Sequence, residues 1–306
     1  MRHFLPESCW TKYSDCSRLA VSKPIMGRTG KQSTISFMLL RCKTDAARLR
    51  GVVLFYKKGA RTDTRTAFSN ARGKRNERCQ MYKDAEKIIN MIEAVSTDVR
   101  FSETDVDKLI ADAKKYHYCR IVGPMCYIEK MSRELEGTGV GFSAPIATPS
   151  GVGETTESKI QGSKYIIEHS KITVDIDMVI NLVYINSGRF DLAQQDIEAV
   201  RKAFPDHCLK VVIEAPMLDD EKLRGACLAV KNAGADYIKT STGATGTTTV
   251  ELVKKIRDIA GYDIGIKAAG GIRTLETVEA MIALGVDRFG MNYKTAHDFS
   301  EMLMNM

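Results

Sequence analysis

From residue 81 onward, short apolar runs alternate with longer amphipathic stretches. The short runs are rich in β-branched residues and predict strands over 119–122, 140–147, 174–180, 209–214, 236–239, 263–267 and 287–290, with an eighth near 94–99. The longer stretches predict helices over 82–92, 103–116, 125–135, 155–168, 190–203, 218–233, 247–260, 274–284 and 294–304. Strands separated by helices predict repeated βαβ units and a parallel sheet.

Two α/β folds are compatible with this alternation. Eight strand–helix units in about 220 residues fit a (β/α)₈ TIM barrel near its lower size limit. A doubly wound open sheet is the alternative, because it uses the same repeating unit. The alternation alone does not separate the two folds.

The charge of the chain is divided unevenly. Residues 1–80 carry 18 Lys and Arg against 5 Asp and Glu, a formal charge of +13, and show no sustained hydrophobic periodicity. Residues 81–306 carry 27 against 33, a charge of −6, which completes the total of +7. We therefore expect two parts, a basic and disordered N-terminal extension over 1–80 and a barrel over 81–306.

Composition excludes several classes of protein. No apolar run is long enough to predict a membrane span, and the eight cysteines contain no C-x-x-C pair that would predict a zinc site. The five histidines are scattered, so we expect no metal and no other cofactor. We expect a cytoplasmic protein, with organelle targeting by the basic extension as the alternative. The extension lacks interleaved aromatic residues, and we therefore expect no nucleic-acid partner.

Two predicted strands end in lysine, at Lys239 and at Lys267. A buried lysine is costly, and two on neighbouring strands disfavour each other's charge, which lowers one pKa. A lysine that is partly neutral near pH 7 can attack a carbonyl group and form a Schiff base. Asp177, on one face of a strand with Asp175, could relay protons. The alternative is that each lysine simply extends its amine into solvent.

A glycine pair lies just after the second of these lysines. Gly270 and Gly271 precede Thr274, where a helix is predicted to begin. Backbone N–H groups at such a junction can bind phosphate, and the place late in a barrel suits that role. The alternative is a tight turn without a ligand.

Four segments together resemble the deoxyribose-phosphate aldolase family, class I aldolases that fold as (β/α)₈ barrels. The resemblance covers roughly residues 95–295. It rests on DIDMVIN at 175–181, KVVIEA at 210–215, AGADYIKTSTG at 233–243 and GIKAAGGIRT at 265–274. The lysine followed by TSTG and the lysine followed by AAGGIRT form a specific pair.

The resemblance implies a lyase that reversibly cleaves 2-deoxy-D-ribose 5-phosphate to glyceraldehyde 3-phosphate and acetaldehyde, in deoxyribose phosphate and nucleotide catabolism. Lys239 would form the Schiff base, and Lys267 would lower its pKa. Asp177 would move protons with an ordered water. Thr242 would contact the substrate, and Gly270 with Gly271 would hold its phosphate.

The sequence departs from the family at the substrate and phosphate ends. The family commonly has a cysteine where Ile121 stands here, with Cys119 two residues upstream on the same face. Its last strand usually ends in serines that bind phosphate, where this chain has Gly290, Met291 and Asn292. We assign Gly290 and Asn292 to the phosphate site, since the Asn292 amide can donate, whereas the Met291 side chain cannot. Weaker phosphate affinity or a different acceptor aldehyde is therefore expected.

Three functions stay open at this point. The first is a deoxyribose-phosphate aldolase, and the second is a Schiff-base aldolase for another phosphosugar. The third is a catalytically altered relative that acts as a binding or scaffold protein. The expected partner is a small phosphorylated sugar, and the resemblance allows a homodimer.

Overall fold

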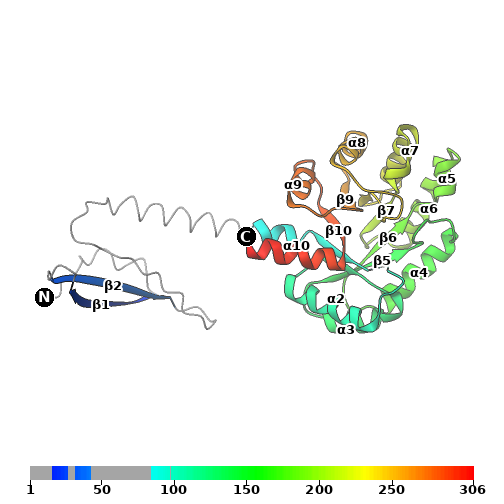
Figure 1. The fold of residues 1–306 in the computed structure, drawn as a ribbon. Coiled ribbons are helices and arrows are strands. Elements are labelled where there is room, and N and C mark those ends of the chain that lie inside the picture. The colour runs from blue at the N-terminus through cyan, green and yellow to red at the C-terminus, as the bar shows by residue number, and fades with distance from the viewer. Residues whose placement is uncertain (1–15, 27–31, 43–83, 97) are drawn as a thin grey trace. The chain divides into compact units, whose positions relative to one another are not determined.

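The computed structural model describes residues 16–26, 32–42, 84–96 and 98–306. The chain divides into two compact units, Met1–Lys74 and Arg75–Met306. In the first unit, β1 (Cys16–Met26) and β2 (Gln32–Cys42) form an antiparallel pair in which Cys16 lies opposite Cys42 (Figure 1).

The sequence does not predict these two strands, although β2 contains the β-branched and aromatic residues that favour extended backbone. The disorder expected over residues 1–80 stays a prediction, and an isolated two-stranded hairpin is only marginally stable in water. For residues 1–15, 27–31 and 43–80 the expected disorder lies outside the described residues. The predicted boundary between 80 and 81 also stays a prediction.

The second unit is a closed barrel of eight parallel strands in the order β10-β3-β4-β5-β6-β7-β8-β9. The predicted TIM barrel is confirmed, and the open sheet is excluded. The strands are β3 (Ile92–Val95), β4 (Arg120–Val122), β5 (Gly141–Ile146), β6 (Val174–Val179), β7 (Leu209–Val212), β8 (Tyr237–Lys239), β9 (Gly265–Ala269) and β10 (Arg288–Asn292).

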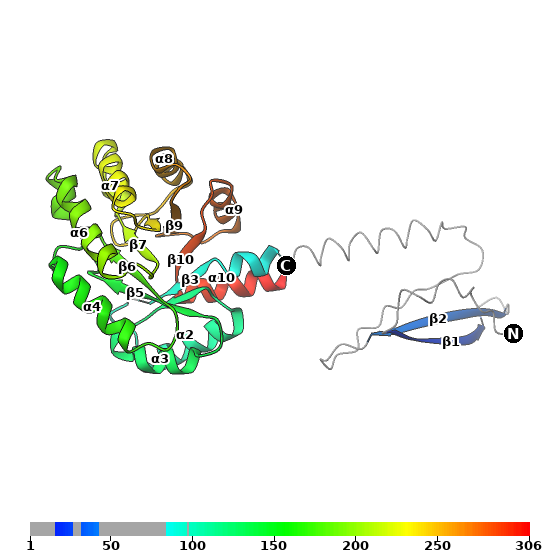
Figure 2. The same ribbon diagram turned by 180° about the vertical axis from the view of Figure 1, so that it is seen from behind.

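The helices surround the strands, as Figures 1 and 2 show from opposite sides. They are α2 (Glu103–Tyr116), α3 (Ile128–Leu135), α4 (Thr156–Glu168), α5 (Leu182–Asn186), α6 (Phe190–Ala203), α7 (Asp220–Asn232), α8 (Val250–Ala260), α9 (Leu275–Ala283) and α10 (Tyr293–Asn305), with 3₁₀ turns η2 (Met125–Tyr127) and η3 (Ala215–Met217). The sequence does not predict α5. None of the helices in the described part of the chain is long and apolar enough to cross a membrane.

Side-chain oxygens determine where many of these helices begin. The Ser102 hydroxyl accepts the Asp105 N–H, and the Asp105 carboxylate accepts the Ser102 N–H, which forms a capping box at α2. Single Thr, Asp or Asn caps begin α4, α7, α8, α9 and α10 in the same way, at Thr155, Asp219, Thr249, Thr274 and Asn292.

The last helix, α10, lies beside α2, the helix that follows β3 (Figures 1 and 2). Polar side chains link the two helices. The Tyr293 hydroxyl donates to Asp105 at 2.8 Å, and His297 Nδ1 lies 3.0 Å from the Asp112 carboxylate. These contacts close the ring of helices at the point where β10 pairs with β3.

The strand register arranges the inward-facing side chains in three layers of four, each layer drawn from alternate strands. The layer nearest the N-terminal ends of the strands holds Arg120, Asp175, Tyr237 and Arg288; the middle layer holds Glu93, Ser143, Lys210 and Lys267; the third holds Val122, Asp177, Lys239 and Gly290. Branched apolar residues usually fill such layers, whereas charged residues dominate here.

Two helical glycines provide a matched test of the packing. A Cβ at Gly225 of α7 would lie 2.4 Å from the Phe190 ring, whereas a Cβ at Gly162 of α4 would meet Ile146 at an ordinary 3.6 Å. We expect Gly225→Ala to destabilise the barrel by about 1–3 kcal/mol through overpacking. Gly162→Ala should stabilise it by about 0.5–1 kcal/mol, because alanine favours helix. Chemical denaturation measures both; equal effects of the two variants would contradict the packing described.

Candidate active site

The three residues predicted to be catalytic lie together inside the barrel. Lys239 ends β8, Lys267 lies beside it in register on β9, and Asp177 comes from β6. The Lys239 amine donates to both oxygens of Asp177, at 3.1 and 3.0 Å. The Lys267 amine lies 2.5 Å from Asp177 Oδ2. One carboxylate therefore serves two ammonium groups.

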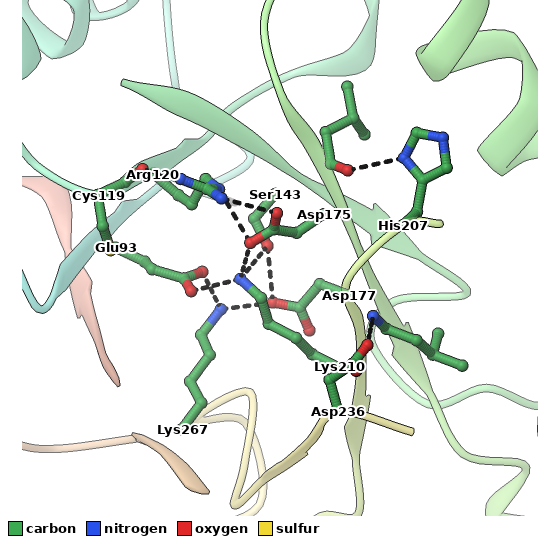
Figure 3. Close-up of polar contacts among 12 residues, drawn as sticks. Glu93, Cys119, Arg120, Ser143, Asp175, Asp177, His207, Lys210, Asp236 and Lys267 are labelled. Atoms are coloured by element: carbon green, nitrogen blue, oxygen red, sulfur yellow. Dashed lines mark hydrogen bonds and ion pairs between the residues drawn. The ribbon is translucent and has the colours of Figure 1, made fainter. Parts of the chain in front are cut away.

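A second carboxylate continues the network on the other side of Lys267. The Lys267 amine lies 2.5 Å from Glu93 Oε2, and the amine of Lys210 on β7 donates to the other oxygen of Glu93 (Figure 3). Ser143 links the two carboxylate centres, since its hydroxyl donates to Asp177 and accepts from Lys210. Glu93, Lys210 and Lys267 are completely buried.

The network ends near the N-terminal opening of the barrel. Lys210 lies 2.9 Å from the Asp175 carboxylate, which Arg120 binds with two nitrogens at 2.9 and 3.0 Å (Figure 3). Gly141 makes room for this arginine, because a Cβ there would lie 2.7 Å from its side chain. Ion pairs thus run without a break from the active-site lysine to the opposite mouth.

This path joins four cations through three carboxylates, and Arg288 in the layer of Arg120 adds a further positive charge, so positive charge is in excess. Burial lowers the pKa of Lys239, nearby Asp177 raises it, and Lys267 lowers it again, with a result of about 8. Lys239 is only 7% exposed and has one carboxylate, which it shares. The excess charge is therefore most easily lost from Lys239.

The carboxylates of Asp177 and Glu93 stay ionised. Burial alone would raise the pKa of Asp177, but Lys239, Lys267 and Lys210 outweigh burial and lower the pKa to about 2. Burial would likewise raise the pKa of Glu93, and its two lysines hold that pKa well below the usual range. Asp177 is therefore a permanent base between two amines.

A pocket of about 200 Å³ opens above Lys239. All the residues predicted to bind substrate or phosphate lie on its wall, namely Thr242, Gly270, Gly271, Gly290 and Asn292. Arg273 and Thr295 line it as well. The predicted catalytic and phosphate residues are thus adjacent in space.

Free backbone amides line one end of this pocket. Gly270 and Gly271 adopt φ of 100° and 78°, which favours glycine. Within the described part of the chain, the N–H groups of residues 270–273 have no hydrogen-bond partner. The Asn292 Oδ1 caps α10 by accepting the Lys294 N–H at 3.1 Å, which leaves its NH₂ group able to donate. Such a set of donors at a helix start suits an anion.

Comparison with known proteins agrees with this geometry. A deoxyribose-phosphate aldolase of Clostridium novyi is 40% identical over 197 residues, which are 64% of this chain and 87% of the relative. The deoxyribose-phosphate aldolase of Bacillus subtilis is 38% identical over 205 residues, 66% of this chain and 91% of that protein. The chain belongs to the deoxyribose-phosphate aldolase family. The predicted membership is confirmed.

A solved structure supports the same assignment. The deoxyribose phosphate aldolase of Aeropyrum pernix, described as a tetramer, superposes with a TM-score of 0.64 and 27% identity, over 73% of this chain and 97% of the other. No family model matches the chain. Class I aldolases are lyases, so the predicted enzyme class is confirmed together with the family.

Several members of the aldolase site were missed from the sequence. Glu93 was missed because the strand was predicted near 94–99, whereas β3 begins at Ile92 and includes Glu93. Polar residues directly follow β3, so the sequence does not mark its position clearly. Lys210 and Arg273 lie inside segments that carry the resemblance, but spacing gives them no role. Lys210 could have been found, because it stands in a strand otherwise made of buried apolar residues.

Ile121 does not occupy the position expected from the resemblance. The register pairs Glu93 with Arg120 and Ala94 with Ile121, so Arg120 shares the inward face and Ile121 lies on the outer one. Met291 pairs with Ala94 and is buried in the hydrophobic core, yet it also lines the pocket, where its side chain offers no hydrogen-bond donor. The altered phosphate end of the pocket therefore consists of Met291 and Asn292.

No group of His, Cys, Asp and Glu is placed to hold a metal ion in the part of the chain that the structure describes. The expectation that the protein needs no metal and no cofactor stays a prediction.

The pKa of Lys239 gives a test of the charge network. The neutral amine is the nucleophile, so acetaldehyde adducts on Lys239, trapped with cyanoborohydride, should form faster as pH rises and level off above about 8. Lys267→Met removes a like charge and should move the midpoint up by about one pH unit; Asp177→Asn removes the counter-charge and should move it down by about as much. Shifts of opposite sign would contradict the network.

Proposed function

We propose that the protein reversibly cleaves 2-deoxy-D-ribose 5-phosphate to glyceraldehyde 3-phosphate and acetaldehyde through a Schiff base on Lys239. One observation carries the proposal. A nearly desolvated lysine with a pKa of about 8 shares the Asp177 carboxylate with a second ammonium, beneath a pocket lined with free amides. The relatives, which are deoxyribose-phosphate aldolases, indicate the substrate.

In the first step the neutral Lys239 amine adds to the C1 aldehyde of the open-chain sugar, forming a C–N bond and a carbinolamine. Loss of water from the carbinolamine leaves a protonated imine that can accept electrons. The ionised Asp177 receives a proton from the amine, and an ordered water passes it to the departing hydroxyl. The Lys267 ammonium, 2.5 Å from Asp177, stabilises this carboxylate and supplies the opposing charge.

In the second step the C2–C3 bond breaks. The C3 hydroxyl loses its proton and becomes the aldehyde of glyceraldehyde 3-phosphate, while the electron pair moves to C2 and forms the enamine. A proton returned to C2 gives the imine of acetaldehyde, and water then releases acetaldehyde and the free amine. Thr242 lies on the pocket wall, where its side chain can contact the substrate hydroxyls.

The phosphate is proposed to bind where the pocket has donors and no carboxylate. The amides of residues 270–273, the start of α10 with Asn292, and the Arg273 guanidinium supply hydrogen bonds there. Gly290 keeps this end open, because a Cβ at that position would lie 2.8 Å from the Ala269 Cβ. Since Asn292 retains a free donor, a phosphorylated acceptor is favoured over an unphosphorylated one.

The expected substrate, oligomeric state and cellular location of the protein remain proposals. The substrate of the family is a phosphosugar, and a Schiff-base aldolase for a different phosphosugar is the second candidate, because Asn292 stands where serines are usual. A homodimer and a cytoplasmic location are kept as hypotheses. Analytical ultracentrifugation of the full chain would decide the assembly.

Replacement of the nucleophile tests the reaction. We expect Lys239→Ala to lower turnover of deoxyribose 5-phosphate about a thousandfold or more, because the amine is itself a reactant. Lys239→Arg, which keeps a positive charge without a nucleophilic amine, should be equally inactive. In the wild-type protein, borohydride with acetaldehyde should add one ethyl group, located on Lys239 by peptide mass spectrometry.

Each other outcome of this experiment identifies a different function. A folded wild-type protein that forms no adduct would support the scaffold alternative. An adduct without turnover of deoxyribose 5-phosphate, but with turnover of another phosphosugar in a substrate panel, would support the second candidate.

The phosphate end can be tested separately. Arg273→Ala should raise KM for deoxyribose 5-phosphate about tenfold, because a charge-assisted hydrogen bond is lost, and should leave KM for unphosphorylated deoxyribose unchanged. Arg133→Ala, on the exposed surface of α3 and outside the pocket, is the control and should change neither. Equal effects of Arg273→Ala on both substrates would place the guanidinium away from the phosphate.

A further inference from the structure

Glu214 is a completely buried carboxylate at the end of the barrel where the pocket opens. It follows β7 and precedes η3. Within the described residues it makes no ion pair with a Lys, Arg or His side chain. Burying a carboxylate costs free energy unless hydrogen bonds replace those lost to water. The hydrogen-bond partners of Glu214 therefore indicate its role.

Every hydrogen bond to this carboxylate comes from the loop that follows Lys239. One oxygen accepts the Thr242 N–H at 2.7 Å. The other accepts the Ser241 hydroxyl at 3.0 Å and also the Thr245 hydroxyl. A single side chain thus holds both ends of the segment 241–245.

The backbone around Glu214 directs the side chain toward this loop. Glu214 has φ 51° and ψ 46°, the left-handed region that residues other than glycine rarely adopt. Its neighbour Ala215 donates its N–H to the Thr240 carbonyl at 2.8 Å, which fastens the two loops together. A backbone held in this region by its surroundings is typical of a functional constraint.

The loop that Glu214 holds forms part of the pocket wall. Ser241, Thr242 and Gly243 line the pocket, whereas Glu214 does not. Gly243 packs closely against Gly270 of the proposed phosphate cradle. A shift of the loop would therefore move the Thr242 hydroxyl and the cradle wall while leaving Lys239 on its strand.

We propose that Glu214 is the positioning residue of this aldolase site, holding the segment 241–245 so that Thr242 and the wall of the phosphate pocket face the substrate. The expected effect of Glu214 on KM rests on the proposed function. Schiff-base formation with acetaldehyde depends on Lys239 and its ion pairs, so it should not need Glu214.

Three variants of the full-length protein test this role. Glu214→Ala should raise KM for deoxyribose 5-phosphate about tenfold, while the rate of acetaldehyde trapping on Lys239 stays within about twofold of wild type. Glu214→Gln should recover most of the loss, because its amide oxygen can accept the Thr242 N–H and its NH₂ can donate to the two hydroxyls. Asp219→Ala, an acid five residues on that caps α7, is the control and should leave KM unchanged.

Hydrogen exchange of the segment 241–245 provides a readout that does not depend on the reaction. The Thr242 amide should exchange slowly in wild type and in Glu214→Gln, and quickly in Glu214→Ala. If the wild type fails to cleave deoxyribose 5-phosphate but shows this exchange pattern, the proposed substrate is wrong and the positioning role stands. If Glu214→Ala folds and keeps wild-type KM and exchange, or loses trapping and binding equally, the positioning role is overturned.

Discussion

A network of ion pairs buried inside the barrel is the constraint on which the rest of the site depends. Four cations, Arg120, Lys210, Lys267 and Lys239, share three carboxylates along one path of ion pairs. A carboxylate at the centre of three lysines stays ionised, so the system can lose its excess charge only as a proton from an amine. The amine with the fewest partners is Lys239, which also borders the pocket. Burial of the amine, together with the like charge of Lys267, thus produces the nucleophile.

The strand register brings these charges together. A register slip of one residue would turn Lys210 or Asp177 toward the helices, because side chains on a strand alternate between faces. Small residues make the long side chains fit: Gly141 admits Arg120, and Gly290 leaves space beside Lys267. The barrel tolerates so many buried charges only because nearly every one contacts an opposite charge. Removing a single partner would leave an unpaired charge buried in the barrel.

The sequence allowed the barrel and three of its buried charges to be predicted, because Lys239 and Lys267 follow apolar residues in short strands and Asp177 interrupts an apolar strand. Their partners Glu93 and Lys210 in the middle layer were not predicted. Glu93 contacts Lys210 across 117 residues, a pairing that exists only once β10 has closed on β3. The face on which Ile121 lies could not be predicted for a related reason, since the face of a three-residue strand is set by its neighbours and not by its own pattern. Local periodicity carries no information on either point.

The two ends of the pocket use different chemistry, and the charge network explains why. A negative ligand close to Lys239 would raise the pKa of its amine and remove the nucleophile. The proposed phosphate cradle consists instead of neutral amides and one guanidinium, which hold the dianion by hydrogen bonds at the far wall. Lys267 lies beneath Lys239 and opposes whatever field the bound phosphate still exerts there. A phosphorylated substrate can therefore bind without protonating the lysine that must attack it, although the barrel segment as a whole is acidic.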